Sequence, residues 1–365
     1  MTKKIPWWEP RVGPEEYELI KQVLDSNYIN DGTVTRQFER LLAERTGAKH
    51  AVAVTSGTAA LYLALLAVGV GPGHEVVVPD LTFIATANAA RATGATVVLA
   101  DIDPRTLCLD PDAFERAISG RTRAVIPVHV SGRGAAMADI LRIAQTHGIA
   151  VIEDAAEAFV SRRGGKALGT FGIAGCLSFS PNKSITTGQG GAVLTDDDAV
   201  HTRLRELKDQ GRATTGTGGD DAHPAFGLNF KLTNLQSAVG VAQLARLDER
   251  LDRQRRIYGA YAGALAGVPG VTLPGFDLSG GETPLWTDVV VERRDDLDRS
   301  LREREMDCRR FWHPIHTQLP YQASDDAFPN ATRIGPKALW LPSAFTLDDA
   351  DVAAVSGAIR SFYSR

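Results

Sequence analysis

The chain has 365 residues, of which 44% are hydrophobic and 23% are charged, and its formal net charge at pH 7 is −4. This length and apolar content suffice for one large domain with a substantial core and a second, smaller one. The slightly acidic balance gives no overall attraction to nucleic acid or to an anionic membrane, so any phosphate group must be met by local geometry.

The cysteines and the N-terminal segment indicate a cytoplasmic protein. Cys108, Cys176 and Cys308 lie far apart and form no CxxC pair. This spacing argues against a disulfide framework and against a cysteine-based zinc site. The segment MTKKIPWWEPRVG has no apolar stretch after its two lysines, and no later run approaches the ~18 to 20 apolar residues that cross a bilayer. We therefore expect no membrane association and a cytosolic location.

Periodic apolar residues predict two helices near the N-terminus, over residues 14–26 and 35–47. From residue 51 to residue 154, short apolar runs alternate with amphipathic or small-residue stretches. The strand candidates are AVAVT, EVVVP, ATVVLAD, RAVIPVHV and IAVIED, and Asp110 with Pro111 predicts a helix start between two of them. Such alternation is typical of βα units on a mostly parallel sheet that is covered on both faces.

The second half of the chain predicts the end of this sheet and a smaller domain. CLSFS and GGAVLT are two further strand candidates, a helix follows Asp196, and the glycine-rich TTGTGGDDAH indicates a mobile loop. A long helical pattern over residues 234–261 joins the two halves. A strand in TPLWTDVVVE, a helix in DDLDRSLRERE and a closing helix after Thr346 follow. We expect an α/β fold with a large domain over residues 1–240 and a small α+β domain over residues 241–365.

Ligands of open parallel sheets collect at the carboxyl ends of the strands, and three unusual segments map there. In AVAVTSGTAALYLALLA, a strand, a tight turn at Ser56, Gly57 and Thr58, and a helix follow one another. The N–H groups and dipole of the helix start can hold an anion, although an ordinary helix cap is an equally good interpretation. Asp154 ends the run IAVIED, where a carboxylate needs a cationic or hydrogen-bonding partner unless it merely caps the next helix.

Lys183 is the third feature, since it follows an apolar run and lies between Ser178 and the segment TTGQGG. A lysine partly withdrawn from water can act as a nucleophile toward carbonyls, although an isolated lysine is usually exposed on a loop. One cofactor explains all three segments. Pyridoxal 5′-phosphate needs an amine for its Schiff base, a carboxylate for its pyridinium nitrogen and an anion cradle for its phosphate.

Six segments in this order resemble the DegT/DnrJ/EryC1/StrS aminotransferases, which make nucleotide-linked amino sugars. They are SGTAALYLALLAVGVGPGHEVVVPDLTFIATANAARATGA, DIDP, AVIPVHVSG, VIEDAAEA, SFSPNKSITTGQGGAV and GLNFKLTNLQSAVGVAQL. The resemblance covers nearly the whole chain. It implies the aspartate aminotransferase-like fold (fold type I), with a mostly parallel mixed sheet in the large domain. It also implies a homodimer whose active sites are shared between subunits.

The resemblance assigns roles to individual residues. Lys183 matches the lysine that holds the cofactor as a Schiff base and moves the proton between substrate and cofactor. Asp154 matches the aspartate that keeps the pyridine nitrogen protonated, and Phe83 matches the aromatic residue that stacks on the cofactor. The residues that match the phosphate cradle are Gly57, Thr58 and Ser178, together with Asn229 from the neighbouring subunit.

Four positions depart from the common family pattern. Glu157 stands where many members carry glutamine beside the cofactor's phenolic oxygen, so its carboxylate must be protonated, turned away or paired; glutamate also occurs in perosamine synthase-like members. Gln189 replaces a common glutamate, and Ser180 replaces a frequent aromatic residue or histidine. Lys231 replaces an arginine. The departures at Ser180 and Lys231 weaken any transfer of substrate detail from the family.

Three residues outside these motifs have two interpretations each. His316, in HPIHTQLPY, resembles a C-terminal histidine near the sugar site, and a core or surface histidine is the alternative. Trp7 and Trp8 could line the entrance to the site. Apolar anchoring of the N-terminus is the preferred interpretation for both.

These features predict a ping-pong aminotransferase without a metal. By resemblance, L-glutamate converts the cofactor to pyridoxamine phosphate and leaves as 2-oxoglutarate, and the pyridoxamine then aminates a keto-sugar nucleotide. The run NKSITTGQGG resembles members that aminate C4 of a 4-keto-6-deoxy sugar, including the GDP-perosamine synthases, more than it resembles 3-aminotransferases. We expect C4 amination of a GDP- or dTDP-linked sugar.

Other functions remain as alternatives. A 3-keto sugar or cyclitol aminotransferase of the same family is one. A related 3-dehydratase would carry histidine in place of Lys183, and a regulator without transaminase activity would need neither Lys183 nor Asp154. A nicotinamide dehydrogenase would need GxGxxG after the first strand, where this chain has SGTAAL.

Overall fold

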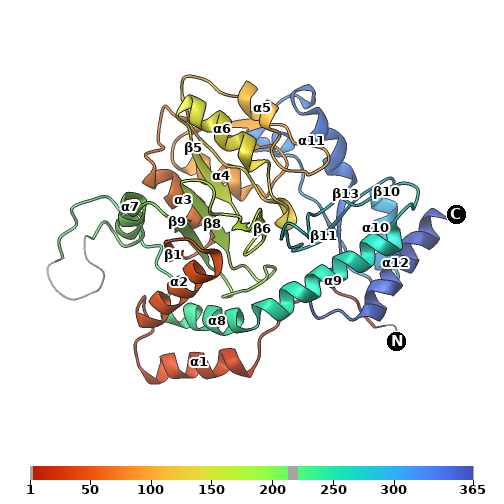
Figure 1. Ribbon diagram of the computed structural model, residues 1–365, viewed down its shortest axis with the longest axis horizontal. Coiled ribbons are helices and arrows are strands. Elements are labelled where there is room, and N and C mark those ends of the chain that lie inside the picture. Colours follow the sequence, from red (N-terminus) through yellow and green to blue (C-terminus); the bar gives the residue numbers. More distant parts are fainter. Residues whose placement is uncertain (1–2, 213–220, 365) are drawn as a thin grey trace.

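The computed structural model describes residues 3–212 and 221–364 and centres on a seven-stranded sheet (Figure 1). The strand order is β1-β9-β8-β5-β4-β2-β3. Neighbours from β8 to β3 run parallel, whereas β9 is antiparallel to both β8 and β1. The predicted mostly parallel mixed sheet is confirmed. Its strands are β1 (His50–Val54), β2 (Glu75–Pro79), β3 (Thr96–Ala100), β4 (Thr122–Val125), β5 (Ala150–Asp154), β8 (Ala174–Ser178) and β9 (Gly191–Thr195).

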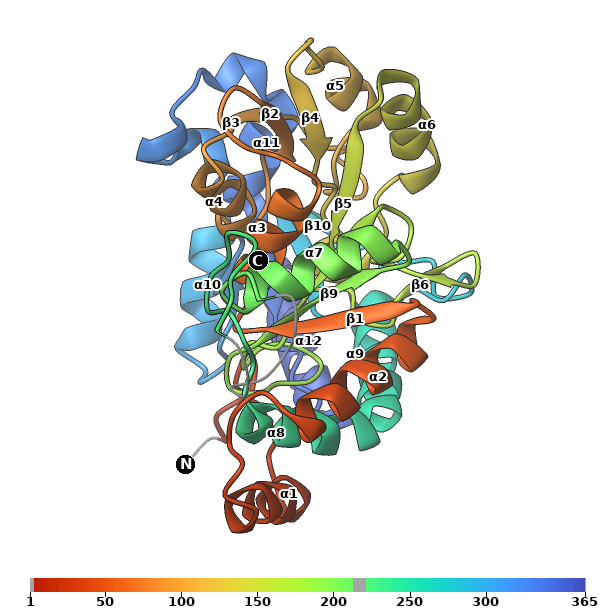
Figure 2. The same ribbon diagram turned by 90° about the vertical axis from the view of Figure 1, so that its left-hand side faces the viewer.

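The strands of this sheet are apolar because helices and loops cover both of its faces. Every residue of β2, β8 and β9 is buried, and helix α3 (Gly57–Ala67) packs against β8 and β9. Figure 2 shows α2 (Thr33–Thr46) and α7 (Asp198–Lys208) beside β1, where both make contact. The predicted strand RAVIPVHV is shorter than expected. Pro127 has no N–H to donate to a ladder, so β4 ends at Val125.

Further helices lie before residue 247, and α1 packs on α8 instead of on the sheet. Asp110 caps the helix that begins at Pro111, as predicted, because its side chain accepts a hydrogen bond from the N–H of Asp112. Most of the predicted mobile loop TTGTGGDDAH lies outside the described residues. The helices are α1 (Pro14–Asp25), α4 (Ala85–Ala92), α5 (Pro111–Arg116), α6 (Met137–His147) and α8 (Asn234–Ala245).

The long helix predicted over residues 234–261 is in fact two helices. Arg246, with φ −108° and ψ 10°, separates α8 from α9 (Leu247–Leu265). The break lets the two helices pack on different parts of the molecule, because α8 contacts α1 and α2 while α9 contacts α12 (Asp349–Tyr363). Figure 1 shows α8 and α9 end to end, with α1 beside one and α12 beside the other.

A second, antiparallel sheet forms in the C-terminal part in the order β10-β11-β13-β12. The N-terminal segment makes an isolated bridge near this sheet, between Ile5 and Met306. The domain boundary at residue 240 stays a prediction. The strands are β10 (Val271–Thr272), β11 (Thr287–Val291), β12 (Arg309–Arg310) and β13 (Ala338–Leu341), with the helices α10 (Arg294–Arg302) and α11 (Pro329–Ile334); a separate hairpin pairs β6 (Arg162–Arg163) with β7 (Lys166–Ala167).

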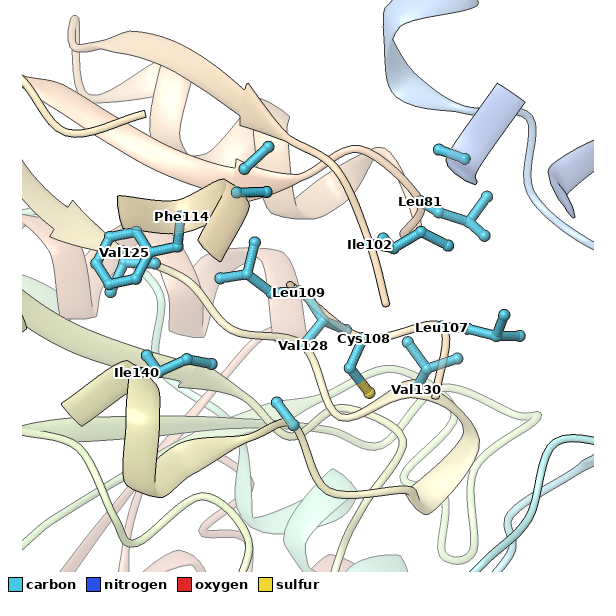
Figure 3. Packing of buried hydrophobic residues seen from close by; sticks show 14 of the residues in the cluster. Leu81, Ile102, Leu107, Cys108, Leu109, Phe114, Val125, Val128, Val130 and Ile140 are labelled. Carbon is cyan, nitrogen blue, oxygen red and sulfur yellow. The ribbon is translucent and has the colours of Figure 1, made fainter. Parts of the chain in front are cut away.

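One hydrophobic core connects the two sheets. It includes Leu81 and Val128, which follow β2 and β4, and it continues to Trp286 and Trp340 of the C-terminal part. Figure 3 shows the portion around Leu81, Cys108 and Val128. This core fixes the C-terminal sheet against the carboxyl ends of the parallel strands. Within the described residues, no helix is both long enough and apolar enough to cross a membrane.

Candidate active site

A cavity of about 320 Å³ lies at the carboxyl ends of the strands of the large sheet. The segments that follow β1, β2, β5 and β8 line one side of it, and side chains of the C-terminal part line the other. Parallel sheets place ligand sites at this edge. The cavity brings together seven of the residues predicted from the sequence, namely Gly57, Thr58, Phe83, Asp154, Glu157, Ser178 and Lys183.

Lys183 is held at the cavity wall. Its Nζ lies 3.4 Å from Oε1 of Glu157 and 4.7 Å from the ring centroid of Trp286. Only 12% of its side chain is exposed, so it is not a solvated loop residue. An amine in this position can reach a carbonyl group that enters the cavity.

Asp154 presents a buried carboxylate at the end of β5. Its Oδ2 accepts a hydrogen bond from the hydroxyl of Thr86 at 2.9 Å, and its Oδ1 accepts one from the N–H of Ala156 at 3.1 Å. Burial raises the pKa of this carboxyl above its ordinary value. The next element is the short strand β6, so the helix-cap interpretation of Asp154 is wrong. A cation beside it in the cavity would favour the charged form of the carboxyl.

The start of α3 forms an anion cradle with Ser178. The Ser56 hydroxyl caps the helix by accepting a hydrogen bond from the N–H of Ala59 at 3.1 Å. The N–H groups of the first helical turn have no partner within the helix, and Gly57, the first residue of that turn, lies beside the Ser178 side chain. A Cβ atom on Gly57 would approach Cβ of Ser178 to 2.9 Å, so glycine keeps this space open. Ser56 can therefore cap the helix while the start of the helix also holds an anion, so the two interpretations of this turn are compatible.

Replacing Gly57 with alanine should weaken cofactor binding. The added methyl group would push the Ser178 hydroxyl away from the helix start, and overpacking of this size costs about 1–3 kcal/mol. We expect the Kd for pyridoxal phosphate, measured by fluorescence titration, to rise on the order of 10-fold. Gly259→Ala is the matched control, because a Cβ at that helical position meets nothing within 4 Å. An unchanged Kd in Gly57→Ala would contradict the cradle.

Glu157 is paired with Lys183. Of the three states that the sequence left open for this carboxylate, which are protonated, turned away or paired, the structure shows the paired one. Its Oε2 accepts a hydrogen bond from the N–H of Ser131 at 2.9 Å, and its Oε1 faces the Lys183 amine. Burial nevertheless raises the pKa of the Glu157 carboxyl. The side chain therefore takes up a proton more readily than an exposed glutamate.

This shift predicts a pH effect on stability. Because the folded protein binds the Glu157 proton more tightly than the unfolded chain, this group weakens the fold as the pH rises above 4.5, the ordinary value. The glutamine of Glu157→Gln cannot ionise, so the Tm of this variant should fall less than that of the wild type as the pH rises above 4.5. Thermal unfolding of the cofactor-free proteins measures this. Parallel Tm profiles for the two proteins would contradict it.

Two predicted residues lie outside the lining of the cavity. Asn229 is exposed and bridges to Asp209, and Lys231 pairs with the same aspartate. His316 is buried, with Nδ1 at 2.6 Å from Asp80 and its ring stacked 4.9 Å from that of Phe328. The structure does not bring His316 together with the other predicted site residues. Three of the four departing positions, Glu157, Ser180 and Gln189, line the cavity.

Sequence reasoning missed the wall that the C-terminal part contributes. Trp286, Trp312, Trp340 and Arg309 line the cavity, as does Thr86 from α4. In the sequence, only the presence of these tryptophans pointed to such a wall. Their spacing matches no motif that would have indicated a site.

The two N-terminal tryptophans anchor the chain, as preferred from the sequence. Trp7 packs 5.4 Å from Trp286, and Trp8 Nε1 donates a hydrogen bond to the carbonyl of Pro181 at 2.9 Å. Neither of them lines the cavity. The bond to Pro181 ties the N-terminal segment to the loop that carries Lys183.

The donor set of the cavity fits pyridoxal 5′-phosphate. Lys183 would hold its aldehyde carbon, Asp154 would face its ring nitrogen, and the start of α3 with Ser178 would hold its phosphate. When bound, the cofactor supplies an electron-accepting ring that stabilises negative charge on a substrate carbon. The open space beside Gly57 and the unneutralised carboxyl of Asp154 are what such a group requires.

Comparison with known proteins agrees with this geometry. A model of the DegT/DnrJ/EryC1/StrS aminotransferase family matches residues 10–360. The GDP-perosamine synthase of Caulobacter vibrioides is 39% identical over 360 residues, which cover 96% of each protein. The GDP-perosamine synthase of Escherichia coli O157:H7 is 35% identical over 366 residues, which cover 99% of each protein.

A solved structure supports the fold as well. The S. venezuelae protein DesV, in complex with a ketimine intermediate, is 35% identical and matches with a TM-score of 0.91 over 96% of this chain and 95% of that chain. The aminotransferase fold expected from the sequence is thus confirmed, and the protein is a transaminase. The chain belongs to the DegT/DnrJ/EryC1/StrS aminotransferase family, whose members depend on pyridoxal 5′-phosphate.

Proposed function

We propose that this aminotransferase moves the amino group of L-glutamate to C4 of a GDP-linked 4-keto-6-deoxy sugar. The observation that carries the proposal is the meeting of the Lys183 amine, the Asp154 carboxyl and the α3 anion cradle in one cavity. Relatives named GDP-perosamine synthase, at 39% and 35% identity over nearly the full length, support the choice of sugar and nucleotide.

Each of the charged and aromatic residues of the cavity has a separate role in the reaction. The Lys183 ε-amine takes a proton from the donor carbon in the first half-reaction and returns one to the acceptor carbon in the second. Glu157 holds this amine from one side, and the indole of Trp286 covers it from the other. Asp154 would face the ring nitrogen of the bound cofactor and favour its protonated form, and the tryptophans of the C-terminal wall limit access of water.

The proposal includes a homodimer in the cytoplasm. Asn229 is exposed and outside the cavity of its own chain, a position compatible with its expected contact to the phosphate in a neighbouring subunit. Large apolar side chains such as Tyr17 and Phe226 are also exposed on the single chain, with 70% and 65% of their surface accessible. All three cysteines are buried and unpaired, which suits a reducing compartment.

The substrate assay compares keto sugars with the ketone at different carbons. The purified holoenzyme is incubated with L-glutamate and either a GDP-linked 4-keto-6-deoxyhexose, its dTDP counterpart or a nucleotide-linked 3-keto sugar. We expect kcat/KM to be highest for the GDP-linked 4-keto compound, by about 10-fold or more. Amination of the 3-keto sugar alone would overturn the proposed position of attack, and a preference for dTDP would overturn the proposed nucleotide.

A further inference from the structure

All five tryptophans of the chain lie in one cluster beside the cavity. Trp286 packs 4.9 Å from Trp340, and Trp340 packs 4.9 Å from Trp312, measured between ring centroids. These three line the cavity, and Trp7 and Trp8 pack behind them. The cluster forms an aromatic wall whose Trp286 ring faces the Lys183 amine.

Arg309 is the cationic member of this wall. It lies on β12 opposite Trp340 of β13, and its guanidinium carbon is 4.9 Å from the ring centroid of Trp7 and 5.6 Å from that of Trp340. It also lines the cavity. Aromatic faces attract a guanidinium and hold its plane in a defined orientation.

This guanidinium has no anionic partner in the part of the chain that the structure describes, residues 3–212 and 221–364. No carboxylate lies within ion-pair distance of it there, and no hydrogen bond joins it to another group. The adjacent Arg310 differs, because it pairs with Asp298 at 3.1 Å and with Asp295 at 3.5 Å. The Arg309 guanidinium lies at the wall of the cavity without an ion-pair partner among the described residues. It can therefore donate two parallel hydrogen bonds to an anionic group of a ligand.

Among the charged side chains that line the cavity in the described part of the chain, Arg309 is the one available to bind an anionic group of a ligand. Among the described residues that line it, the cations are Lys183 and Arg309, and the carboxylates are Asp154 and Glu157. Lys183 already faces Glu157 and is needed for the cofactor, so it cannot also neutralise a substrate. Both proposed substrates are anions, because L-glutamate carries carboxylates and a nucleotide sugar carries a diphosphate.

We infer that Arg309 is a substrate-binding residue that holds anionic oxygens of the incoming substrate, either a carboxylate of the amino donor or the diphosphate of the acceptor. The inference rests on the proposed function for the identity of these substrates. Two parallel hydrogen bonds from the guanidinium would fix the substrate at the aromatic wall. The reacting carbon would then face Lys183 across the cavity.

The test measures the two half-reactions separately in Arg309→Gln and Arg309→Lys holoenzymes. One arm titrates L-glutamate and follows the visible absorption of the cofactor, and the other titrates the GDP-linked keto sugar against enzyme already loaded with the amino group. We expect the apparent dissociation constant in one arm to rise about 10- to 100-fold in Arg309→Gln, with a smaller rise in Arg309→Lys. Arg310→Gln is the matched control and should behave as the wild type does.

The two titrations show which anionic group Arg309 binds. A rise confined to L-glutamate assigns Arg309 to a carboxylate, and a rise confined to the keto sugar assigns it to the diphosphate. Unchanged constants in both arms, in a folded variant, would overturn the inference and leave the proposed function standing. A wild-type enzyme that performs neither half-reaction would instead overturn the proposed function.

A measurement on the unmodified enzyme covers the case in which the variants do not fold. Phenylglyoxal modifies accessible arginines, and mass spectrometry can follow Arg309 and Arg310 separately. We expect 2-oxoglutarate or GDP to protect Arg309 while leaving the modification of Arg310 unchanged. Equal modification of Arg309 with and without both probes would overturn the inference.

Discussion

Replacing Lys183 with alanine is expected to lower the rate of amino transfer by at least about 10³-fold while leaving the protein folded. The Lys183 side chain lines the cavity, so its loss enlarges a space that already exists and leaves the packing of the strands unchanged. The carboxyl of Glu157 loses its partner, but its raised pKa lets it take up a proton and avoid a buried unpaired charge. Turnover assays, together with thermal unfolding, separate the two effects.

Lys183→Arg is the matched control for charge. Arginine keeps a cation beside Glu157 but cannot form a Schiff base with a carbonyl, so it should be as inactive as alanine and closer to the wild type in stability. The visible absorption band that appears when pyridoxal phosphate is added should be lost or shifted in both variants. Near-normal turnover in Lys183→Ala would show that the lysine is not the reacting amine.

The predicted residues that meet in the cavity lie at the end of a recognisable strand or shortly after it. Lys183 and Gly57 come shortly after short apolar runs, and Asp154 ends one. The parallel topology brings the ends of such runs to one edge. Their meeting in one cavity could therefore be inferred without knowing any distance. The pairing of Glu157 with Lys183 needed the structure, because sequence alone left three possible states for that carboxyl.

The opposite wall could not be predicted from local patterns. Trp286 and Arg309 lie more than a hundred residues after Lys183, and their contacts depend on how the C-terminal sheet packs against the large one. His316 shows the reverse case. Its motif pointed to the sugar site, whereas its contacts with Asp80 and Phe328 are internal. The break at Arg246 was likewise hidden, because the apolar period continues through it.

Replacing Asp154 with asparagine is expected to lower the rate of amino transfer by about 10²- to 10³-fold. Asparagine can keep both local hydrogen bonds, since its carbonyl accepts from the N–H of Ala156 and its amide donates to the hydroxyl of Thr86. The substitution therefore removes the negative charge with little change in shape. Without that charge, the ring nitrogen of the cofactor loses its counter-ion and withdraws electrons less strongly.

The stability of the Asp154→Asn variant distinguishes a functional carboxylate from a structural one. Burial raises the pKa of Asp154, so its charge weakens the cofactor-free fold, and the variant should unfold at the same Tm as the wild type or higher. Asp101→Asn is the matched control, since this buried carboxylate accepts the N–H groups of Asn330 and Ala331 and lies outside the cavity. It should lose about 1–3 kcal/mol of stability and keep its activity. If Asp154→Asn were instead destabilised and active, the carboxyl would serve the fold and not the reaction.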